Sequence, residues 1–403
     1  MDVEPEPVEH APPPSPGVPA EVVVDLGAVA HNAGLLKDLV APAALMAVVK
    51  ADAYGHGLVP VARAALAGGA DALGVAHVHE ALALRAAGVQ AEVLAWILTP
   101  GTDLVPAVAQ GVDLSVAAGW ALEEVAAAAR AVGRPAGIHL EVDTGMSRGG
   151  AAPGEWPDLL DAVAKHVADG LVEVRGTWGH FAGADEVGAP TVPAQLAAFE
   201  AALAVARGRG VDPGRRHHAN SAAALFLPAT RYDLVRAGLA LYGLSPAPAL
   251  ATAADLGLVP AMTLTARVAH VRRVPAGSGV SYGLTYVTRR DSTLALVPVG
   301  YGDGLPRQAS WDGGRSGRVL LGGVRRPIAG RVCMDQVVLD LGDDDAAPGD
   351  VAVLFGTGAD GAPTAQDWAE AAGTISYEIV TRIGPRVPRR HVGGPQAGGP
   401  GAR

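Results

Sequence analysis

The stretch LMAVVKADAYGHGLVPVARAALAGGADALGVA, residues 45–76, decides the fold of this chain. It opens with a short apolar run, passes through a glycine-containing loop into an Ala-rich helical stretch at 61–69, and closes with a second apolar run. Apolar runs that alternate with helical stretches are typical of strand–helix–strand units with parallel, buried strands. We therefore predict a βαβ unit here, with Lys50 at the C-terminal end of its first strand.

The same alternation continues from about residue 21 to residue 245. The candidate strands are EVVVDL (21–26), LMAVVK (45–50), DALGVA (71–76), EVLAWI (92–97), VDLSVA (112–117), GIHLEVD (137–143), LVEVRGTWGH (171–180), RRHHANS (215–221) and YDLVRAG (232–238). They predict an α/β fold, a (β/α)8 TIM barrel, with one strand candidate more than the eight that it needs. One end strand belongs elsewhere, or one assignment is wrong. A doubly wound sheet is less favoured, because no Gly-x-Gly-x-x-Gly turn follows the early strands.

The sequence pattern changes after about residue 256. Short, partly alternating runs follow there, punctuated by Gly, Pro and Asp: MTLTARVAHVRRV (262–274), TLALVPVG (293–300), RVLLGGV (318–324), VVLDLG (337–342) and VAVLFG (351–356). They indicate a separate, mostly β C-terminal domain. The predicted organisation is a disordered Pro-rich tail at 1–19, a barrel at 20–250, a β domain at 251–392 and a second disordered tail at 393–403.

The composition excludes several classes of protein. The chain has 403 residues with 41 acidic and 31 basic side chains, and its net charge of −10 argues against a nucleic-acid or anionic-membrane binder. No apolar run is long enough to span a bilayer, and no basic, apolar leader opens the chain. The single cysteine, Cys333, cannot form an intramolecular disulfide, which fits a reducing cytoplasm.

Lysine is rare in this sequence, so each lysine can be considered separately. Only Lys37, Lys50 and Lys165 are present among the 31 basic residues. Lys50 ends an apolar run and enters a loop with two glycines, and in a parallel barrel this end of the strands forms the rim where active sites lie. A lysine there can lose solvation, drop its pKa and attack a carbonyl as a neutral amine. The alternative is an ordinary solvated lysine.

The phrase VVKADAYGHG (48–57) resembles the pyridoxal-phosphate lysine segment of alanine racemases, a family with a barrel domain followed by a β domain. Further phrases of that family follow in the same order: VDTGMSRGG (142–150), GHFAGADE (179–186), HHANSAA (217–223), VRAGLALYG (235–243), VSYGLTY (280–286), VPVGYGDG (297–304), GRVCMDQ (330–336) and ISYEIVTRIGPRVPR (375–389). One phrase would be weak, but nine in order across residues 20–390 are highly specific.

The resemblance implies the catalytic groups. Lys50 would hold pyridoxal 5'-phosphate as an aldimine and act as a base on one face of the substrate α-carbon. Tyr282 matches the second base on the opposite face, although by composition alone it is a strand aromatic. A tyrosine hydroxyl is a weak base at neutral pH, and the family supplies a helping neighbour in His180, itself linked to Arg236. In the family the tyrosine comes from the other subunit of a homodimer with shared active sites, so we expect a homodimer.

The resemblance also implies how cofactor and substrate are bound. Arg236 would face the pyridine nitrogen and leave it unprotonated, the alternative being a structural ion pair. The phosphate contacts would come from Tyr54, Asn220, Ser221, Gly238, Leu239 and Tyr377. Ser221 could equally be a helix cap. The substrate carboxylate would meet Arg148 and the Met334 backbone N–H, and Tyr301 would line a narrow opening together with Tyr377.

Two positions depart from the family pattern. Many members carry a carbamylated lysine seven residues before the arginine that matches Arg148, and this chain has Glu141 there. We hypothesise that Glu141 supplies the orienting negative charge directly. Trp178 stands where tyrosine is common. The twelve histidines show no spacing typical of metal ligands, so we expect no metal.

The predicted function is therefore alanine racemisation by two-base α-proton transfer, which supplies D-alanine for peptidoglycan. A racemase with broader or serine preference is one alternative, because these motifs do not fix substrate breadth. A barrel-type pyridoxal-phosphate decarboxylase is another, but its Gly-Pro-Thr-Cys-Asp phrase is absent. A non-catalytic cofactor-binding protein is a third, and the extra β domain argues against it.

Overall fold

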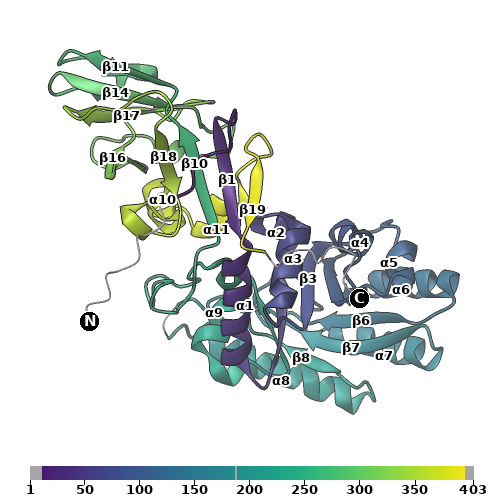
Figure 1. The fold of residues 1–403 in the computed structure, drawn as a ribbon. Coiled ribbons are helices and arrows are strands. Elements are labelled where there is room, and N and C mark those ends of the chain that lie inside the picture. Colours follow the sequence, from purple (N-terminus) through teal and green to yellow (C-terminus); the bar gives the residue numbers. More distant parts are fainter. Residues whose placement is uncertain (1–10, 187, 395–403) are drawn as a thin grey trace, which may run out of the picture. The chain divides into compact units, whose positions relative to one another are not determined.

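The computed structural model describes residues 11–186 and 188–394, which form two compact units (Figure 1). The barrel unit comprises residues 29–53 and 58–259. The β unit comprises residues 11–28, 54–57 and 260–394, so that it includes a short piece of chain directly after the Lys50 segment. Of the tails predicted at 1–19 and 393–403, residues 1–10 and 395–403 lie outside the described residues.

Eight parallel strands form the barrel, in the order β8-β7-β6-β5-β4-β3-β2-β9. Their bounds are β2 Ala44–Val48, β3 Ala72–His77, β4 Glu92–Ile97, β5 Asp113–Val116, β6 Ala136–Glu141, β7 Val172–Trp178, β8 Arg215–His217 and β9 Leu234–Ala237. Figure 1 labels β3, β6, β7 and β8. Across the seam between β8 and β9, Asp233 N donates to Arg216 O (3.1 Å) and Arg236 N donates to Ala219 O (3.0 Å). These bonds nearly close the sheet, and the predicted barrel is confirmed.

Helices follow the strands, as a parallel sheet with both faces covered requires. Their bounds are α1 Leu26–Val40, α2 Lys50–Gly55, α3 Leu58–Ala67, α4 Val78–Ala86, α5 Val105–Ala109, α6 Gly119–Val132, α7 Trp156–Ala168, α8 Thr191–Gly208, α9 Ser221–Phe226, η1 Pro228–Thr230 and η2 Leu239–Tyr242. In α6 the Ala-rich sequence buries one face that includes Leu122 and Val125. The helix ends at Gly133, whose left-handed φ of 75° lets its N–H donate to Ala129 O (2.8 Å).

Apolar side chains fill one part of the barrel interior. Met46, Leu94 and Leu234 are completely buried against each other, with Trp96 packed beside them. Gly74 on β3 is needed here, because a Cβ at this position would lie 2.6 Å from the Trp96 ring. Small residues on one strand thus face large residues on its neighbour, so that side chains fill the barrel interior.

The surplus strand candidate belongs to the β unit. The run at 21–26 forms β1 (Ala20–Asp25), which pairs antiparallel with β10 (Met262–Arg267) and parallel with β19 (Arg389–Val392). The range 20–250 predicted for the barrel thus begins with a strand of the other unit. Its first five residues are all buried, so it needs neighbours on both edges and both faces, and the β unit supplies them.

Three sheets make up the β unit, in the orders β16-β15-β18-β10-β1-β19, β11-β14-β17 and β12-β13. The remaining strands are β11 His270–Val274, β12 Gly279–Val280, β13 Tyr286–Val287, β14 Ser292–Val297, β15 Arg318–Leu321, β16 Val324–Pro327, β17 Val337–Gly342 and β18 Val351–Phe355. The helical elements are η3 Tyr282–Leu284, η4 Arg307–Ala309, η5 Ala359–Gly361, α10 Ala365–Ala372 and α11 Ser376–Thr381. The predicted mostly β character of this region is confirmed.

Residues 11–19, which were predicted to be disordered, have a defined path. The Pro14 carbonyl accepts a hydrogen bond from Arg267 Nη2 (2.7 Å), and Ser15 Oγ donates to Glu21 Oε1 (2.7 Å). Proline lacks an N–H but keeps its carbonyl acceptor, so a Pro-rich segment can still be fixed by arginine donors. Composition alone does not show those donors.

None of the helices formed by residues 11–186 and 188–394 combines the length and the apolar character that crossing a bilayer would require.

Candidate active site

Lys50 follows β2 at the C-terminal rim of the barrel and begins a turn of unusual handedness. The next four residues, 51–54, have φ values between 52° and 54°, and Gly55 has a φ of 77°. A left-handed turn of non-glycine residues costs roughly 1–2 kcal/mol per residue. Bonds from Ala53 N to Val49 O (2.8 Å) and from Leu58 N to Asp52 Oδ1 (2.7 Å) help to hold it. Strain of this kind is concentrated at functional sites.

Glu80 on α4 fixes the same segment, and sequence reasoning missed it. Its buried carboxylate accepts hydrogen bonds from Ala51 N (2.6 Å), Ala76 N (2.9 Å) and His77 N (2.9 Å). A glutamate at the third position of a helix is a recognised sequence signal for a helix N-terminus. That signal predicts the bonds at the end of β3, but the bond to Ala51 is a tertiary contact that it does not reveal.

The Lys50 amine lies in a partly desolvated, cationic environment. Its Nζ is 5.7 Å from the centroid of the Trp96 ring. Burial lowers the pKa of Lys50, Arg148 and Arg236 lower it further, and Glu80 opposes them. Lys165 is exposed on α7, and Lys37 pairs with Asp71 at 2.6 Å. Of the three lysines, Lys50 is the one whose surroundings favour a neutral, nucleophilic amine.

Arg236 on β9 is almost completely buried, with 4% of its surface exposed. Its Nη1 donates to His217 O (2.8 Å) and its Nη2 donates to Gly179 O (2.7 Å), while the guanidinium lies 4.7 Å from the Trp178 ring centroid. Burial lowers its pKa from the ordinary value of arginine to about 9, against the opposing effect of Glu141. The guanidinium therefore remains charged at neutral pH, and its nearest partners are carbonyls rather than a carboxylate.

His180 contacts this arginine directly. Its Nδ1 lies 3.3 Å from Arg236 Nη2, and burial, followed by the charge of Arg236, holds the pKa of His180 well below its ordinary value. The imidazole is therefore neutral at pH 7. Because an arginine nitrogen can only donate, we assign Nδ1 as the acceptor and place the proton on Nε2.

Four of the predicted phosphate contacts lie together at the ends of β8 and β9. Ser221 Oγ accepts from Gly238 N (2.8 Å) and from Ala240 N (3.4 Å). The cap of α9 is Asn220, whose Oδ1 accepts from Ala223 N (3.0 Å), so Ser221 does not have the capping role. Leu239 follows Gly238 as the first residue of η2. A hydroxyl and converging backbone amides suit a phosphate group, and with the Lys50 amine this donor set fits pyridoxal phosphate.

Glu141 ends β6 beside Arg148 and Arg236. Burial raises the pKa of Glu141 to about 7, although Arg236 and then Arg148 favour the charged form. A Cβ at Gly149 would lie 3.2 Å from Glu141 Oε1, so the loop that carries Arg148 packs directly on the carboxylate. Asp143 Oδ1 holds that loop by accepting from the backbone N–H groups of residues 145, 146 and 147, at 2.9–3.1 Å.

Two further predicted phosphate contacts belong to the β unit. Tyr54 is buried, and its ring centroid lies 6.2 Å from that of Tyr377. Burial, and then the charge of Tyr377, raise the pKa of Tyr54. Gly55 allows the close packing, because a Cβ there would lie 2.7 Å from Val380 O. The structure brings these two tyrosines together within one unit.

The remaining predicted site residues lie on exposed loops of the β unit. Tyr301 N donates to Cys333 O (2.9 Å) and Gly302 N donates to Met334 O (2.8 Å), which joins their two loops. Cys333 Sγ also lies 3.3 Å from Ser281 Oγ, next to Tyr282. The structure thus gathers Tyr282, Tyr301 and Met334, all of which are exposed in the single chain.

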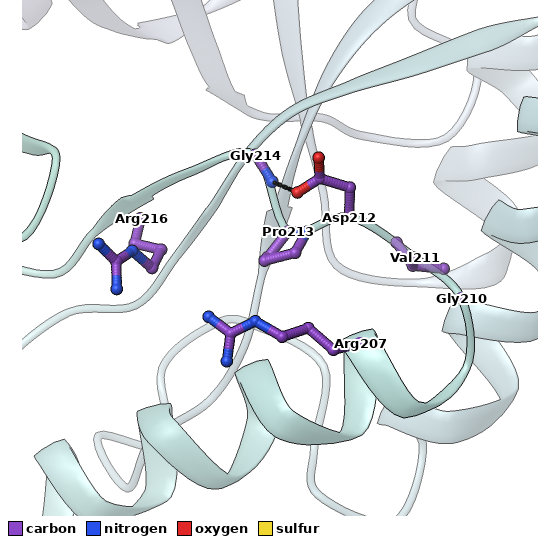
Figure 2. A pocket seen from close by; sticks show the side chains of 7 residues that line it. All are labelled: Arg207, Gly210, Val211, Asp212, Pro213, Gly214 and Arg216. Atoms are coloured by element: carbon purple, nitrogen blue, oxygen red, sulfur yellow. Dashed lines mark hydrogen bonds between the residues drawn. The ribbon is translucent and has the colours of Figure 1, made fainter.

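Two surface pockets lie at the other end of the barrel, where the strands begin. Figure 2 shows one of them, in which the Arg207 and Arg216 side chains flank the loop that precedes β8. Arg216 is held by Asp233 through Nε (2.7 Å) and Nη2 (2.8 Å). The second pocket, of about 620 Å³, is lined by residues that include Glu92 and Asp113. Neither pocket contains a predicted site residue.

The fold and the site together define a class of protein: an amino-acid racemase, that is an isomerase, built from a lysine-bearing barrel and a β domain. The model of the alanine racemase N-terminal domain matches residues 24–246, and that of the C-terminal domain matches residues 261–391. The chain belongs to the alanine racemase family, whose members are pyridoxal-phosphate-dependent isomerases. The resemblance carried by the nine phrases is thereby confirmed.

Individual relatives agree over nearly the whole chain. An alanine racemase of Salinispora tropica is 59% identical over 93% of this chain and 98% of its own length. A solved alanine racemase from Streptomyces lavendulae has a TM-score of 0.92 at 53% identity, covering 94% of this chain and 98% of its own. One from Streptomyces coelicolor A3(2) has a TM-score of 0.90 at 53% identity, covering 93% and 98%.

Proposed function

We propose that this chain interconverts L-alanine and D-alanine with pyridoxal 5'-phosphate as its cofactor. The observation that carries the proposal is the Lys50 amine, whose pKa is lowered by burial and by Arg148 and Arg236 at the barrel rim. The names of the relatives support alanine as the substrate. L-Serine serves as the competing substrate in the test below.

The cofactor-binding roles follow from the donor set. When bound, pyridoxal phosphate supplies an electron-withdrawing ring that stabilises the charge left by the departing α-proton. Lys50 would hold it covalently, and the phosphate contacts would come from Tyr54, Asn220, Ser221, Gly238, Leu239 and Tyr377. Arg236 would face the ring nitrogen and, because a guanidinium keeps its protons, would leave that nitrogen unprotonated.

Two bases on opposite faces of the α-carbon are required for racemisation. The neutral amine of Lys50 can accept the α-proton on one face. We assign the other face to the Tyr282 hydroxyl, which returns a proton to give the mirror-image product. The Nε2–H of His180 is a donor that can stabilise the tyrosine oxygen when it has lost its proton.

Substrate selection would rest on a few side chains. The planar guanidinium of Arg148 suits the substrate carboxylate, and the Met334 N–H adds a second donor. Glu141 would orient Arg148 by its negative charge, which is half developed near pH 7. Tyr301 and Tyr377 would narrow the opening so that a methyl side chain is favoured.

A homodimer with shared sites would complete the chemistry. In the single chain 71% of Tyr282, 53% of Met334 and 40% of Tyr301 is exposed. Exposed large apolar groups that gather on adjoining loops mark an interaction surface. We therefore infer that each site takes Tyr282 from the partner subunit. The enzyme would work in the cytoplasm, where D-alanine is needed for peptidoglycan precursors, and its lone cysteine suits that compartment.

The first test measures the reaction itself. Purified protein loaded with pyridoxal phosphate is incubated with L-alanine, and in parallel with L-serine, and the D-amino acid is quantified. D-Alanine as the faster product supports the proposal. Faster serine conversion would indicate the serine-preferring alternative, and cofactor binding without exchange of the α-proton would indicate a non-catalytic protein.

The second test addresses the shared site. Lys50→Ala and Tyr282→Ala proteins, each of which should be inactive alone, are mixed under conditions in which subunits exchange. A mixed dimer carries one intact site, so random pairing should restore about a quarter of native activity. No recovery after exchange has been verified with labelled subunits would rule the shared site out.

A further inference from the structure

A row of polar side chains runs through the barrel interior from Arg236 to the opposite end of the strands. Arg236 Nη1 lies 3.0 Å from His217 Nδ1, and His217 Nε2 lies 2.8 Å from His139 Nδ1. His139 Nε2 then faces Asp113 Oδ2 at 3.6 Å and Glu92 Oε1 at 4.0 Å. Both histidines are completely buried.

The neighbouring strands are shaped to hold this row. A Cβ at Gly137 would lie 2.0 Å from Asp113 Oδ1, and a Cβ at Gly176 would lie 2.7 Å from His139 Nδ1. Glycine at these two positions therefore clears the space that the carboxylate and the imidazole occupy. Trp178 stacks on His217, with ring centroids 6.0 Å apart and an interplanar angle of 7°.

The protons in this row can be assigned from its two ends. Arg236 can only donate, so His217 Nδ1 accepts and the His217 proton is on Nε2. That proton is donated to His139 Nδ1, which places the His139 proton on Nε2. There it faces the carboxylates of Asp113 (3.6 Å) and Glu92 (4.0 Å), which are too far away for a hydrogen bond, but their negative charges attract the proton. Both histidines are neutral in this arrangement, and every hydrogen bond runs in the same direction, away from the arginine.

We propose that Asp113, His139 and His217, hereafter the interior relay, are positioning residues that hold the Arg236 guanidinium from the far end of the barrel. The carboxylate selects the His139 tautomer, His139 selects that of His217, and His217 then presents an acceptor to Arg236. Hydrogen bonds in such a chain polarise one another, so removing the terminal charge weakens the contact at the arginine.

The lowered pKa of His217 agrees with this arrangement. Burial, followed by the nearby His139 and Arg236, holds the pKa of His217 well below its ordinary value. A protonated His217 would turn Nδ1 into a donor facing the Arg236 N–H. The geometry of the relay and the lowered pKa thus both favour a neutral His217.

A metal ion is the competing occupant of the lower end. Ligand atoms of Glu92, Asp113 and His139 lie within 4.8 Å of one another. A metal on His139 Nε2 would move the His139 proton to Nδ1, from which it would be donated to His217 Nε2. The His217 proton would then be on its own Nδ1, where it would face the N–H donor of Arg236. Glu92 is in addition already bonded to Arg215. A proton on Nε2 fits this row, and a metal does not.

The decisive experiment reads the tautomers directly. Full-length, cofactor-loaded protein with ring-¹⁵N histidine is examined by NMR, and the signals are assigned with His139→Gln and His217→Gln variants. His139 and His217 should each carry the proton on Nε2, and His217 should not titrate between about pH 5 and pH 8. A proton on Nδ1 of either ring, or a His139 signal that shifts on addition of Zn²⁺, would overturn the relay.

Variants connect the relay to the reaction. Asn at 113 can donate as well as accept, so Asp113→Asn should populate the second His139 tautomer and lower kcat by about tenfold. The KM for alanine should not change. Glu173→Gln is the matched control. Glu173 lines the same surface pocket as Asp113 but pairs with Arg175 at 3.0 Å, so this variant should retain the native kcat.

A double-mutant cycle guards against simple misfolding. Asn at 139 can still accept from His217 but no longer connects it to Asp113, so adding Asp113→Asn to His139→Asn should have no further effect on kcat. Additive losses would contradict the relay. The activity measurements rest on the proposed function, whereas the tautomer measurement does not. If the native chain fails to racemise alanine, the proposed function is refuted, and the NMR result alone decides whether the relay exists.

Discussion

The barrel unit and the β unit present their candidate site residues in opposite ways. Arg236 in the barrel is 4% exposed, and burial shifts the pKa values of Lys50, His180 and Glu141. Tyr282 in the β unit is 71% exposed. Burial prepares the charge states of the barrel groups within one chain. The tyrosine would acquire comparable surroundings in the proposed homodimer, where a partner would cover it.

The backbones of the two regions show the same contrast. The barrel rim places its side chains at strand ends, where regular hydrogen bonding fixes them. In the β unit, Tyr282 lies between Ser281 (φ 64°) and Leu284 (φ 47°), so strained loop residues aim it outward. One half of the proposed site is therefore built by the core of one chain, and the other half lies on loops that, in the proposal, a partner would cover.

Lys50→Ala should have the largest effect, because in the proposed mechanism it removes both the cofactor attachment and one base from the barrel side. We expect a loss of racemisation of more than about 10³-fold, together with loss of the visible absorbance of lysine-bound pyridoxal phosphate. Lys165→Ala is the matched control, since that lysine is exposed on α7. Retention of a tenth of native activity by Lys50→Ala would break the assignment.

Tyr282→Phe should have the next largest effect, because it removes one proton from the β-unit side and leaves Lys50 in place. Interconversion should fall by about 10²–10³-fold. Exchange of the α-proton in D₂O, followed by NMR, should persist for one enantiomer, since the base on one face remains. Tyr286→Phe is the control: its hydroxyl donates to Asp340 (2.7 Å) and has no assigned role in the reaction.

Much of the barrel could be predicted from sequence, because apolar runs and Ala-rich helices repeat and Lys50 stands at the end of a run. The membership of β1 could not, since its apolar run looks like a barrel strand and its partners, β10 and β19, lie far away in sequence. The left-handed turn after Lys50 was also hidden, because three of its residues, at 51–53, are Ala, Asp and Ala rather than glycine.

The site was predictable where a short phrase places several groups together, as in the residues around Ser221 and Arg236. It was not predictable where a contact spans the barrel. His139 and His217 are 78 residues apart, and alternation along a strand indicates only that each points inward. Asn220 and Ser221 are both good cap residues, so sequence could not decide which one caps α9.

Glu141 offers a pH test of the barrel side, with an effect of intermediate size. Its folded-state pKa of about 7 lies above the ordinary 4.5, so the native protein should lose stability as pH rises through this range. Compared with Glu141→Gln, the native protein should lose about 3 kcal/mol of its free energy of unfolding between pH 4 and pH 8. Denaturant unfolding of both proteins at pH 4 and pH 8 measures this loss. If native protein and variant differ in free energy of unfolding by the same amount at both pH values, the raised pKa of Glu141 is refuted.

The same residue controls Arg148 in the proposed mechanism. As pH rises through 7 the carboxylate gains its charge, so at pH 8 Glu141→Gln should raise the KM for alanine by about tenfold. Glu141→Lys should become dependent on added bicarbonate, whereas the native enzyme should not. A native activity that increases with bicarbonate would show that Glu141 does not replace a carbamylated lysine.

Trp178→Tyr should have the smallest effect, because Arg236 is held by several partners in the barrel and not by the indole alone. The substitution loses the bond from Trp178 Nε1 to Ser115 Oγ (2.9 Å) and part of the ring over the guanidinium. We expect a destabilisation of about 1–2 kcal/mol and a change in kcat below about threefold, since the carbonyls of Gly179 and His217 still fix the charge. Trp120→Tyr, on an exposed part of α6, is the control for a tryptophan change without these contacts. A tenfold fall in kcat for Trp178→Tyr alone would mean that the indole, rather than the carbonyls and the interior relay, sets the position of Arg236.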